Sequence, residues 1–175
     1  MKKITAIACA AAMLASGTSF AAAHLLRVRK TAAIDASAAK VWGLTKNFDG
    51  LNTWHPAVAT DVIVSGTNNK AGAVRLLTLK GGGTIKEQLI SFDAAHRKFR
   101  YRILEGVLPV SHYTSTFIVE PRGKNKCTVI WAGWFKRKDL SAHPAAKADD
   151  KTAIDTIGGV YTAGLENLKK IAEAK

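Results

Sequence analysis

Six segments between Val58 and Lys136 alternate apolar with polar residues, and short connections of turn-forming and polar residues separate them. The segments are VATDVIVSG, AVRLLTLK, TIKEQLISFD, KFRYRIL, VSHYTSTFIVE and CTVIWAGWFK. A period of two places successive side chains on opposite faces of a strand, so each segment is predicted to form a strand. The connections are too short for crossover helices, so consecutive strands must pair antiparallel. This part of the chain is therefore restricted to an antiparallel meander.

The tail from Ala146 to Lys175 has a helical period instead. Its apolar residues recur every three or four positions and form one stripe, as expected for a long helix that covers a sheet. The stripe consists of Ile154, Ile157, Tyr161, Leu165, Leu168 and Ile171. Gly158 and Gly159 interrupt the helix, and each costs roughly 1 kcal/mol relative to alanine. We therefore expect a close approach of helix and sheet at this point, or a bend over a cavity.

The segment before the meander supplies one strand and two short helices. Leu25 to Ile34 alternates enough for a first strand, and Asp35 or Ser37 can cap a following helix. The string FDGLNTWHP then reads as a turn or second helix that ends at Pro56. The predicted fold is α+β: a curved antiparallel sheet of about seven strands around a long C-terminal helix, with two short helices after the first strand.

The first 23 residues have the pattern of an export signal. Two lysines precede a run of small and apolar residues, with small residues suited to cleavage near Ala23. We expect residues 1–23 to be removed, residues 24–175 to form a single domain in the periplasm, and no transmembrane segment to remain. Cys127 is then the one cysteine left, and the histidines are scattered, so no disulfide, metal site or cofactor is expected.

Positive charge is the strongest property of the composition. The chain has a formal net charge of +13, and without Lys2 and Lys3 it keeps 24 basic and 13 acidic residues, or +11. Such a charge favours an acidic protein, an anionic envelope surface or an anionic ligand. Nucleic acid is not an expected partner for an exported protein.

Alternation within the strands separates a basic face from an aromatic one. In KFRYRIL, Lys98, Arg100 and Arg102 share one side of the strand, while Tyr101 points to the other. The basic side is either a solvated exterior or a docking surface for an acidic partner. Four further residues are assigned to the same partner-binding surface: Lys86, Lys136, Arg137 and Lys138.

On the inner side, Tyr101, Tyr113 and Trp131 are candidates for an aromatic cavity wall, with ordinary core packing as the alternative. Arg75 and Glu87 interrupt neighbouring strands at positions expected to point inward. They can pair with each other, which lowers the cost of burying either charge, or they can bind a polar group of a ligand.

The string Trp54-His55-Pro56 follows the predicted second helix. Proline restricts His55 to extended geometry and makes this turn rigid. His55 could serve as a general base near neutral pH, but no nucleophile or carboxylate is paired with it in the sequence. A rigid corner with an aromatic gate at Trp54 is the preferred interpretation, and no residue is assigned a catalytic role.

Several strings together resemble the START / Bet v 1-like superfamily, in particular its polyketide cyclase/dehydrase type 2 branch. They are SAAKVWGLTKNFDGLNTWHPAV, GAVRLLTLKGGGTIKEQLISFD, FRYRILEGVLPVSHYTSTFIVEP and CTVIWAGWF. The resemblance implies a helix-grip fold whose internal cavity binds hydrophobic or amphipathic small molecules, with the segment around Trp54 at the cavity mouth. The cavity would then be lined by Trp54, His55, Arg75, Glu87, Tyr101, Tyr113, Trp131 and Tyr161.

A narrower resemblance is to the MxaD-type accessory proteins of bacterial methanol oxidation. It implies a periplasmic, non-catalytic protein that helps methanol dehydrogenase pass electrons to an acidic cytochrome c, with the basic surface as the contact. Two alternatives remain. One is a carrier or sensor of a small hydrophobic or lipid ligand, and the other is a cyclase-like enzyme that uses His55, Glu87 or a cavity tyrosine.

Overall fold

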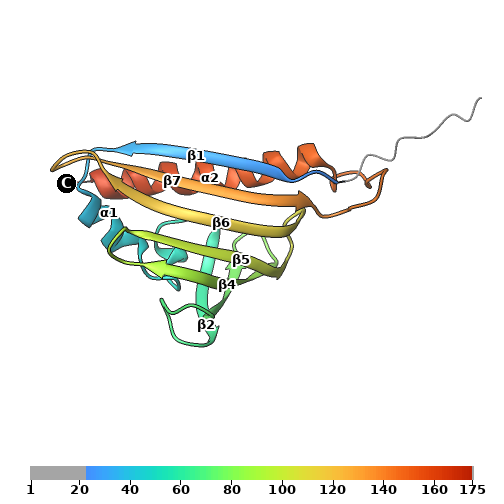
Figure 1. Ribbon diagram of the computed structural model, residues 1–175, viewed down its shortest axis with the longest axis horizontal. Coiled ribbons are helices and arrows are strands. Elements are labelled where there is room, and N and C mark those ends of the chain that lie inside the picture. The colour runs from blue at the N-terminus through green and yellow to red at the C-terminus, as the bar shows by residue number, and fades with distance from the viewer. Residues whose placement is uncertain (1–22, 175) are drawn as a thin grey trace, which may run out of the picture.

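The computed structural model describes residues 23–174, and within them seven strands form one antiparallel sheet (Figure 1). The strands are β1 (Leu26–Ile34), β2 (Val58–Ser65), β3 (Val74–Leu79), β4 (Thr84–Asp93), β5 (Lys98–Gly106), β6 (Val110–Pro121) and β7 (Cys127–Arg137). Their order in the sheet is β1-β7-β6-β5-β4-β3-β2, so β2 to β7 form the predicted meander and β1 pairs with β7 at one edge. The predicted export signal lies, apart from Ala23, outside the described residues.

Three helical segments accompany the sheet. They are α1 (Ala38–Thr45), a short 3-10 helix η1 (Leu51–Thr53) and α2 (Asp150–Glu173). Ser37 caps α1, because its side chain accepts a hydrogen bond from the Lys40 amide, and Asp149 caps α2 in the same way. The two short helices expected after the first strand are thus α1 and η1.

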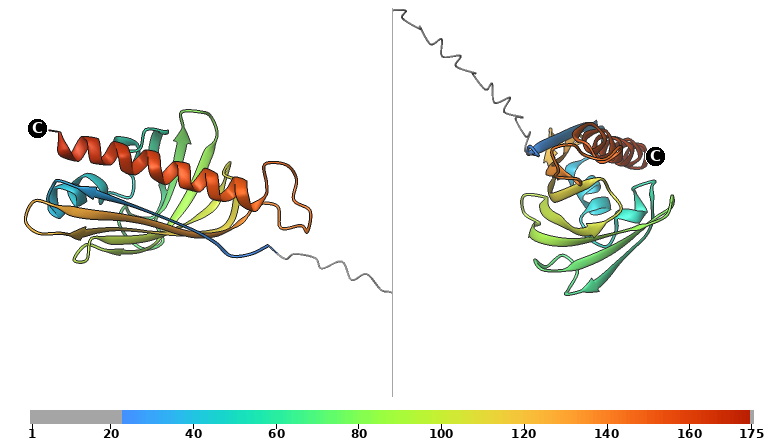
Figure 2. Two further views of the ribbon diagram at one scale, coloured as in Figure 1. Left: turned by 90° about the horizontal axis from the view of Figure 1, so that it is seen from above. Right: turned by 90° about the vertical axis from the view of Figure 1, so that its right-hand side faces the viewer.

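Helix α2 lies along the inner side of the sheet and packs mainly against β1 and β7 (Figure 2). Its apolar stripe faces the sheet, so that Ile157, Tyr161, Leu165 and Leu168 are buried. Ile154, at the beginning of the stripe, is 39 % exposed. The sheet curls around the far side of this layer, and the single core lies between the sheet, α1 and α2.

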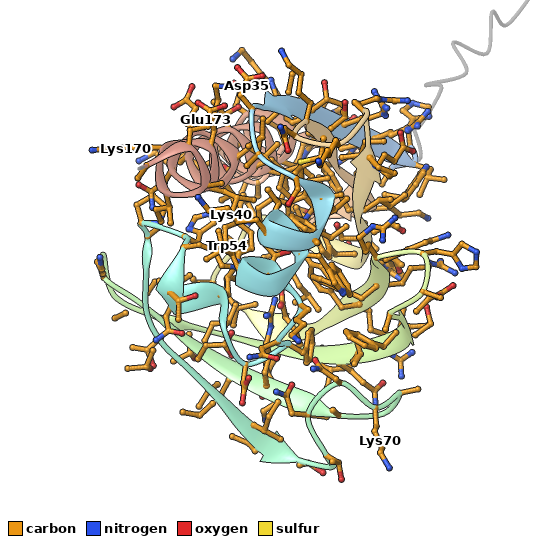
Figure 3. The ribbon with its side chains drawn as sticks, turned by 90° about the vertical axis from the view of Figure 1, so that its left-hand side faces the viewer. Asp35, Lys40, Trp54, Lys70, Lys170 and Glu173 are labelled. Carbon is orange, nitrogen blue, oxygen red and sulfur yellow. The ribbon has the colours of Figure 1, made fainter. Side chains whose placement is uncertain are left out.

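Side chains close the end of the molecule where β1 leads into α1. The Asp35 amide donates to the Glu173 carboxylate over 2.7 Å, and the Lys40 ammonium donates to the Ala174 carbonyl (Figure 3). Asp35 therefore ties β1 to the last turn of α2 and is not the cap of α1.

Two glycines permit close packing of α2, but they are not the pair expected from the sequence. A Cβ on Gly158 would lie 3.8 Å from the Lys30 Cε, an ordinary contact, and one on Gly159 would meet open space. A Cβ on Gly164, in contrast, would lie only 2.6 Å from the His55 ring, and one on Gly133 of β7 would overlap the Tyr161 hydroxyl. Helix and sheet approach each other at Gly164 and Gly133, so the close approach expected at Gly158 and Gly159 was wrong.

Candidate functional site

A small cavity lies between the inner face of the sheet and α2. Its volume is about 70 Å³. That space holds on the order of five water molecules or one small organic molecule, whereas pockets for drug-sized ligands measure roughly 300–1,000 Å³. Most of the wall is apolar and is formed by Leu51, Ala57, Val58, Leu77, Leu79, Ile85, Ile103, Leu108, Ile157 and Val160. A lipid or a polyketide chain does not fit this cavity.

Five of the eight residues predicted to line the cavity do so: His55, Glu87, Tyr101, Tyr113 and Trp131. The other three lie behind this wall. Arg75 donates a hydrogen bond to the Glu87 carboxylate, and the Tyr161 ring stacks on the Trp131 ring with centroids 4.4 Å apart.

Trp54 is a core residue and not a gate at a cavity mouth. Its ring packs against Phe117 and Trp131, in each case with centroids 5.6 Å apart, and only 3 % of the residue is exposed. The preceding η1 turn directs this side chain inward, and the Asn167 amide donates to the Trp54 carbonyl and ties the turn to α2.

The predicted Arg75–Glu87 pair exists, and Asp61 joins it. Arg75 on β3 lies opposite Glu87 on β4, and its Nε and Nη2 both donate to Glu87 Oε2, over 2.8 and 2.6 Å. Its Nη1 donates to Asp61 Oδ2 on β2 over 3.2 Å and to the Phe48 carbonyl. Asp61 was not predicted as part of this pair, although it interrupts an apolar strand as Arg75 and Glu87 do.

This cluster contains two acids and one base, all buried. Burial raises the pKa of Glu87 and of Asp61, and the shared guanidinium of Arg75 offsets only part of that effect. With both carboxyls ionised, the cluster has a net charge of −1. Within residues 23–174, the hydrogen bonds to Glu87 end on Oε2 and none ends on Oε1, although the side chain lines the cavity.

A chain of hydroxyl groups runs behind the cavity wall. Ser115 Oγ donates to the Ala132 carbonyl over 3.0 Å, and because it has one proton it must accept from Tyr161, 2.9 Å away. The Tyr161 proton is thereby used, so Tyr113 donates to Tyr161 over 2.5 Å. The proton of Tyr113 therefore points away from the cavity, and its oxygen keeps only the capacity to accept.

Tyr101 stands at the other end of this chain. It accepts a hydrogen bond from Trp131 Nε1 over 2.9 Å, and its hydroxyl lies 3.4 Å from that of Tyr113, longer than an ordinary O–H···O bond. Burial raises the pKa of Tyr101 to about 12 and that of Tyr113 well above its usual value. Both phenols are therefore protonated at physiological pH.

His55 has no ring nitrogen left for catalysis. Its Nδ1 accepts from the Ala57 amide over 3.2 Å, which leaves Nε2–H to donate to the Val160 carbonyl over 3.0 Å. Burial lowers the pKa of the imidazole, so the ring is neutral at neutral pH. The contacts support the predicted rigid corner, which ties the η1–β2 turn to α2.

The outer face of the sheet is turned toward the viewer in Figure 1, because α2 lies behind it. Cross-strand partners share a face, and two transverse rows of outer residues follow from the register. One row is Arg27, Trp134, Thr114, Arg102 and Gln88, and the next is Arg29, Ala132, Thr116, Arg100 and Ser91. Neither row contains an acidic residue. We call Arg27, Arg29, Arg100, Arg102 and Trp134 the arginine face.

The arginine face overlaps the predicted basic surface only in part. Arg100 and Arg102 are exposed on β5 as expected, with Lys98 beside them. Arg137 was assigned wrongly: it is 4 % exposed and donates to the Asp139 and Ser141 carbonyls and to Asp150. Lys86 forms an ion pair with Glu105, 2.5 Å away.

The remaining predicted basic residues, Lys136 and Lys138, follow Phe135 at the end of β7, where Lys138 is exposed. Arg27 and Arg29 were missed, because no local pattern places β1 beside β7. Arg27 lies over the Trp134 ring, 5.3 Å from its centroid.

No three histidine, cysteine, aspartate or glutamate side chains of residues 23–174 gather closely enough to hold a metal ion. Among the same residues, no helix is long and apolar enough to cross a membrane.

Comparisons with known proteins bear on the whole domain. The family model for polyketide cyclase / dehydrase and lipid transport proteins matches residues 26–173. An uncharacterised protein from Bacillus thuringiensis is 29 % identical with a TM-score of 0.74, and the match covers 85 % of this chain and 100 % of that one. The protein XoxI from Bacillus cereus is 28 % identical with a TM-score of 0.72, over 83 % of this chain and 94 % of that one.

The fold also extends to an enzyme. The ZhuI aromatase/cyclase from a Streptomyces species has a TM-score of 0.69 at 20 % identity, over 86 % of this chain and 94 % of that one. Among proteins of curated function, none matches this chain. The helix-grip fold is thus shared by catalytic and other proteins, and it does not decide the activity.

Proposed function

The chain belongs to the polyketide cyclase / dehydrase and lipid transport family, and we propose that within this family it is a docking protein that binds an acidic partner through the arginine face. The observation that carries the proposal is the pair of transverse rows on the outer sheet. Each row bears an arginine on β1 and another on β5 and lacks acidic residues.

The chemistry of this surface suits a protein partner. Arginine and tryptophan are enriched at the centres of protein interfaces, where a planar guanidinium can bind carboxylates in a bidentate way. Trp134 is half-buried between Arg27 and Thr114, so the face has an aromatic centre with charged flanks. The excess of basic residues in the chain accelerates encounter with an acidic surface.

The partners that we propose are those of an MxaD-type accessory protein: methanol dehydrogenase and an acidic cytochrome c. The resemblance to that group and the 28 % identity to XoxI support this choice. In this proposal, residues 1–23 direct export, residues 24–175 form the single working domain, and the protein acts in the periplasm. The cavity volume favours this role over transport of a lipid.

The test measures binding of the purified exported protein to methanol dehydrogenase and to cytochrome c from the same periplasm, by calorimetry at 20 and at 300 mM NaCl. We expect binding at low salt that weakens at high salt, because exposed charges are screened. Reversal of two charges, Arg100→Glu with Arg102→Glu, is expected to weaken it about tenfold or more.

The matched control makes the same change of charge elsewhere. Lys70 lies in the β2–β3 connection (Figure 3) and Lys124 in the β6–β7 turn; both are exposed, and neither belongs to the arginine face. Lys70→Glu with Lys124→Glu should keep most of the affinity. Equal losses in both variants, salt-independent binding, or no binding to either partner would each contradict the proposal.

A further inference from the structure

The charge cluster beside the cavity contains one acid more than it has bases, and nothing in the docking function requires this excess. Glu87, 5 % exposed, lines the cavity, and its one basic neighbour Arg75 also serves Asp61. Both hydrogen bonds from Arg75 to Glu87 end on Oε2, and Oε1 accepts none from the described residues. Because Glu87 lines the cavity, its Oε1 is available to accept a hydrogen bond from a ligand there, beside a cluster with one acid in excess. Burying an uncompensated charge is costly, so a positive charge in the cavity would be stabilised there.

The other polar groups of the wall also favour a hydrogen-bond donor as ligand. The Tyr113 oxygen can only accept, because its proton is committed to Tyr161. Both nitrogens of His55 are engaged with main-chain groups, and the Trp131 N–H is engaged with Tyr101. Only the Tyr101 hydroxyl has a loosely held proton, because its oxygen lies 3.4 Å from that of its acceptor, Tyr113. An anion in the cavity would thus find few hydrogen-bond donors and would be repelled by the Glu87 carboxylate.

Aromatic rings complete the wall. Tyr101 and Tyr113, with ring centroids 6.1 Å apart, and Trp131 face the cavity, and rings of this kind attract cations. The core already contains one such arrangement: the Arg75 guanidinium lies 4.2 Å from the Phe48 centroid and 5.4 Å from that of Tyr101, while bonded to carboxylates. The cavity offers the same combination of carboxylate and aromatic rings, without the cation.

From these three observations we propose that the cavity binds a small organic cation, a primary alkylammonium ion of a few heavy atoms. Its nitrogen donates to Glu87 Oε1 and to the Tyr113 oxygen, and its alkyl part contacts the apolar wall. The volume of about 70 Å³ restricts the ligand to this size. The site is separate from the arginine face, so this proposal stands or fails independently of docking.

The first experiment compares three probes of similar size and different charge: ethylammonium, ethanol and acetate. The indole N–H of Trp131 is the reporter in two-dimensional NMR of the ¹⁵N-labelled protein, at constant ionic strength. We expect ethylammonium to give a saturating shift with an affinity at least about tenfold higher than ethanol, and acetate to give none. The Trp134 indole on the outer face should not respond. Equal binding of acetate or ethanol, or no saturation with ethylammonium, overturns the proposal.

Variants then locate the site. Glu87→Gln keeps the shape and removes the charge, and it should weaken ethylammonium binding about tenfold or more. Glu105→Gln removes an exposed carboxylate paired with Lys86 and should change nothing. Because loss of Glu87 also disturbs Arg75, a second variant, Leu79→Phe, fills the cavity without touching the charge cluster and should abolish binding. Undiminished binding in a folded Glu87→Gln or Leu79→Phe protein would contradict the assignment.

The pH dependence gives a further check. The ionisable groups around Glu87 are Arg75, Asp61, Tyr101, Tyr113 and Tyr161, with His55 in the facing wall. As pH falls, protonation of Glu87 and of Asp61 removes negative charge, and protonation of His55 adds positive charge. Each change disfavours a cation, so the affinity for ethylammonium should fall from pH 8 to pH 5. A constant or rising affinity would count against the site.

Discussion

At the residue scale, Gly133 is a position where the absence of a side chain is required. It lies on β7 opposite Ser115, where a Cβ would overlap the Tyr161 hydroxyl. Tyr161 is buried and its oxygen is bonded to Tyr113 and Ser115, so it cannot move freely. We predict that Gly133→Ala lowers the free energy of unfolding by about 1–3 kcal/mol in urea denaturation, the usual cost of overpacking.

Removal of the hydroxyl should relieve this cost. In a Tyr161→Phe background the clashing oxygen is gone, so the same Gly133→Ala change should lose clearly less stability. Gly81→Ala in the β3–β4 turn is the control, because a Cβ there meets nothing within 4 Å. Equal losses at Gly133 in both backgrounds would show that the clash is not with the Tyr161 hydroxyl.

The sequence reveals some of these residues and conceals others. Arg75 and Glu87 could be predicted because a charge at an inward strand position needs a partner, and Asp61 gave the same signal. Gly133 and Gly164 could not be predicted. Their role depends on which side chain the fold brings opposite them. Gly133 meets Tyr161 and Gly164 meets His55, and in each case the partner is distant in the sequence.

At the element scale, α2 stabilises the domain through the buried part of its stripe. Leu168 is fully buried, while Ile154 near the beginning of the same stripe is 39 % exposed. We predict that Leu168→Ala lowers the free energy of unfolding by about 2–5 kcal/mol in urea denaturation, because a cavity adds to the lost transfer energy. Ile154→Ala should cost well under half as much. Similar losses at the two positions would mean that the beginning of α2 is packed more tightly than its exposure indicates.

The periodicity of the sequence predicted the individual strands and helices well, but it did not predict how distant strands pair. The alternation of β2 to β7 and the stripe of α2 are local properties, so each strand and the helix were found. The register between β1 and β7 is not local, and it is this register that adds Arg27 and Arg29 to the arginine face. For Arg137 the error is the reverse, because a residue predicted on the basic surface is buried. At the end of β7 it forms hydrogen bonds to the β7–α2 connection and to Asp150.

At the scale of the whole molecule, the sheet separates two chemically opposite surfaces. Its inner side holds the negative cluster and the cavity, and its outer side holds the arginine face. Strand β5 contributes to both, since Tyr101 points inward between the outward Arg100 and Arg102. Positive charge is thus exposed on the outer side of the sheet, while the cluster of Asp61, Arg75 and Glu87 beside the cavity has one acid in excess.

In the free protein at low salt, such a concentration of like charge should reduce the free energy of unfolding, because the arginines repel one another. Arg29 and Arg100 lie in one row, on β1 and β5, and no hydrogen bond or ion pair joins their side chains to the described residues. We predict that Arg29→Gln with Arg100→Gln raises the free energy of unfolding by about 0.5 kcal/mol at 10 mM NaCl, measured in urea. The gain should vanish at 500 mM NaCl, where the Debye length is only about 4 Å.

Lys70→Gln with Lys124→Gln makes the same change of net charge at separated loops and should gain less. If the arginine variant is no more stable than this control at low salt, the charges on the arginine face are too far apart or too well solvated to repel one another. The arginine face would then not reduce the stability of the free protein.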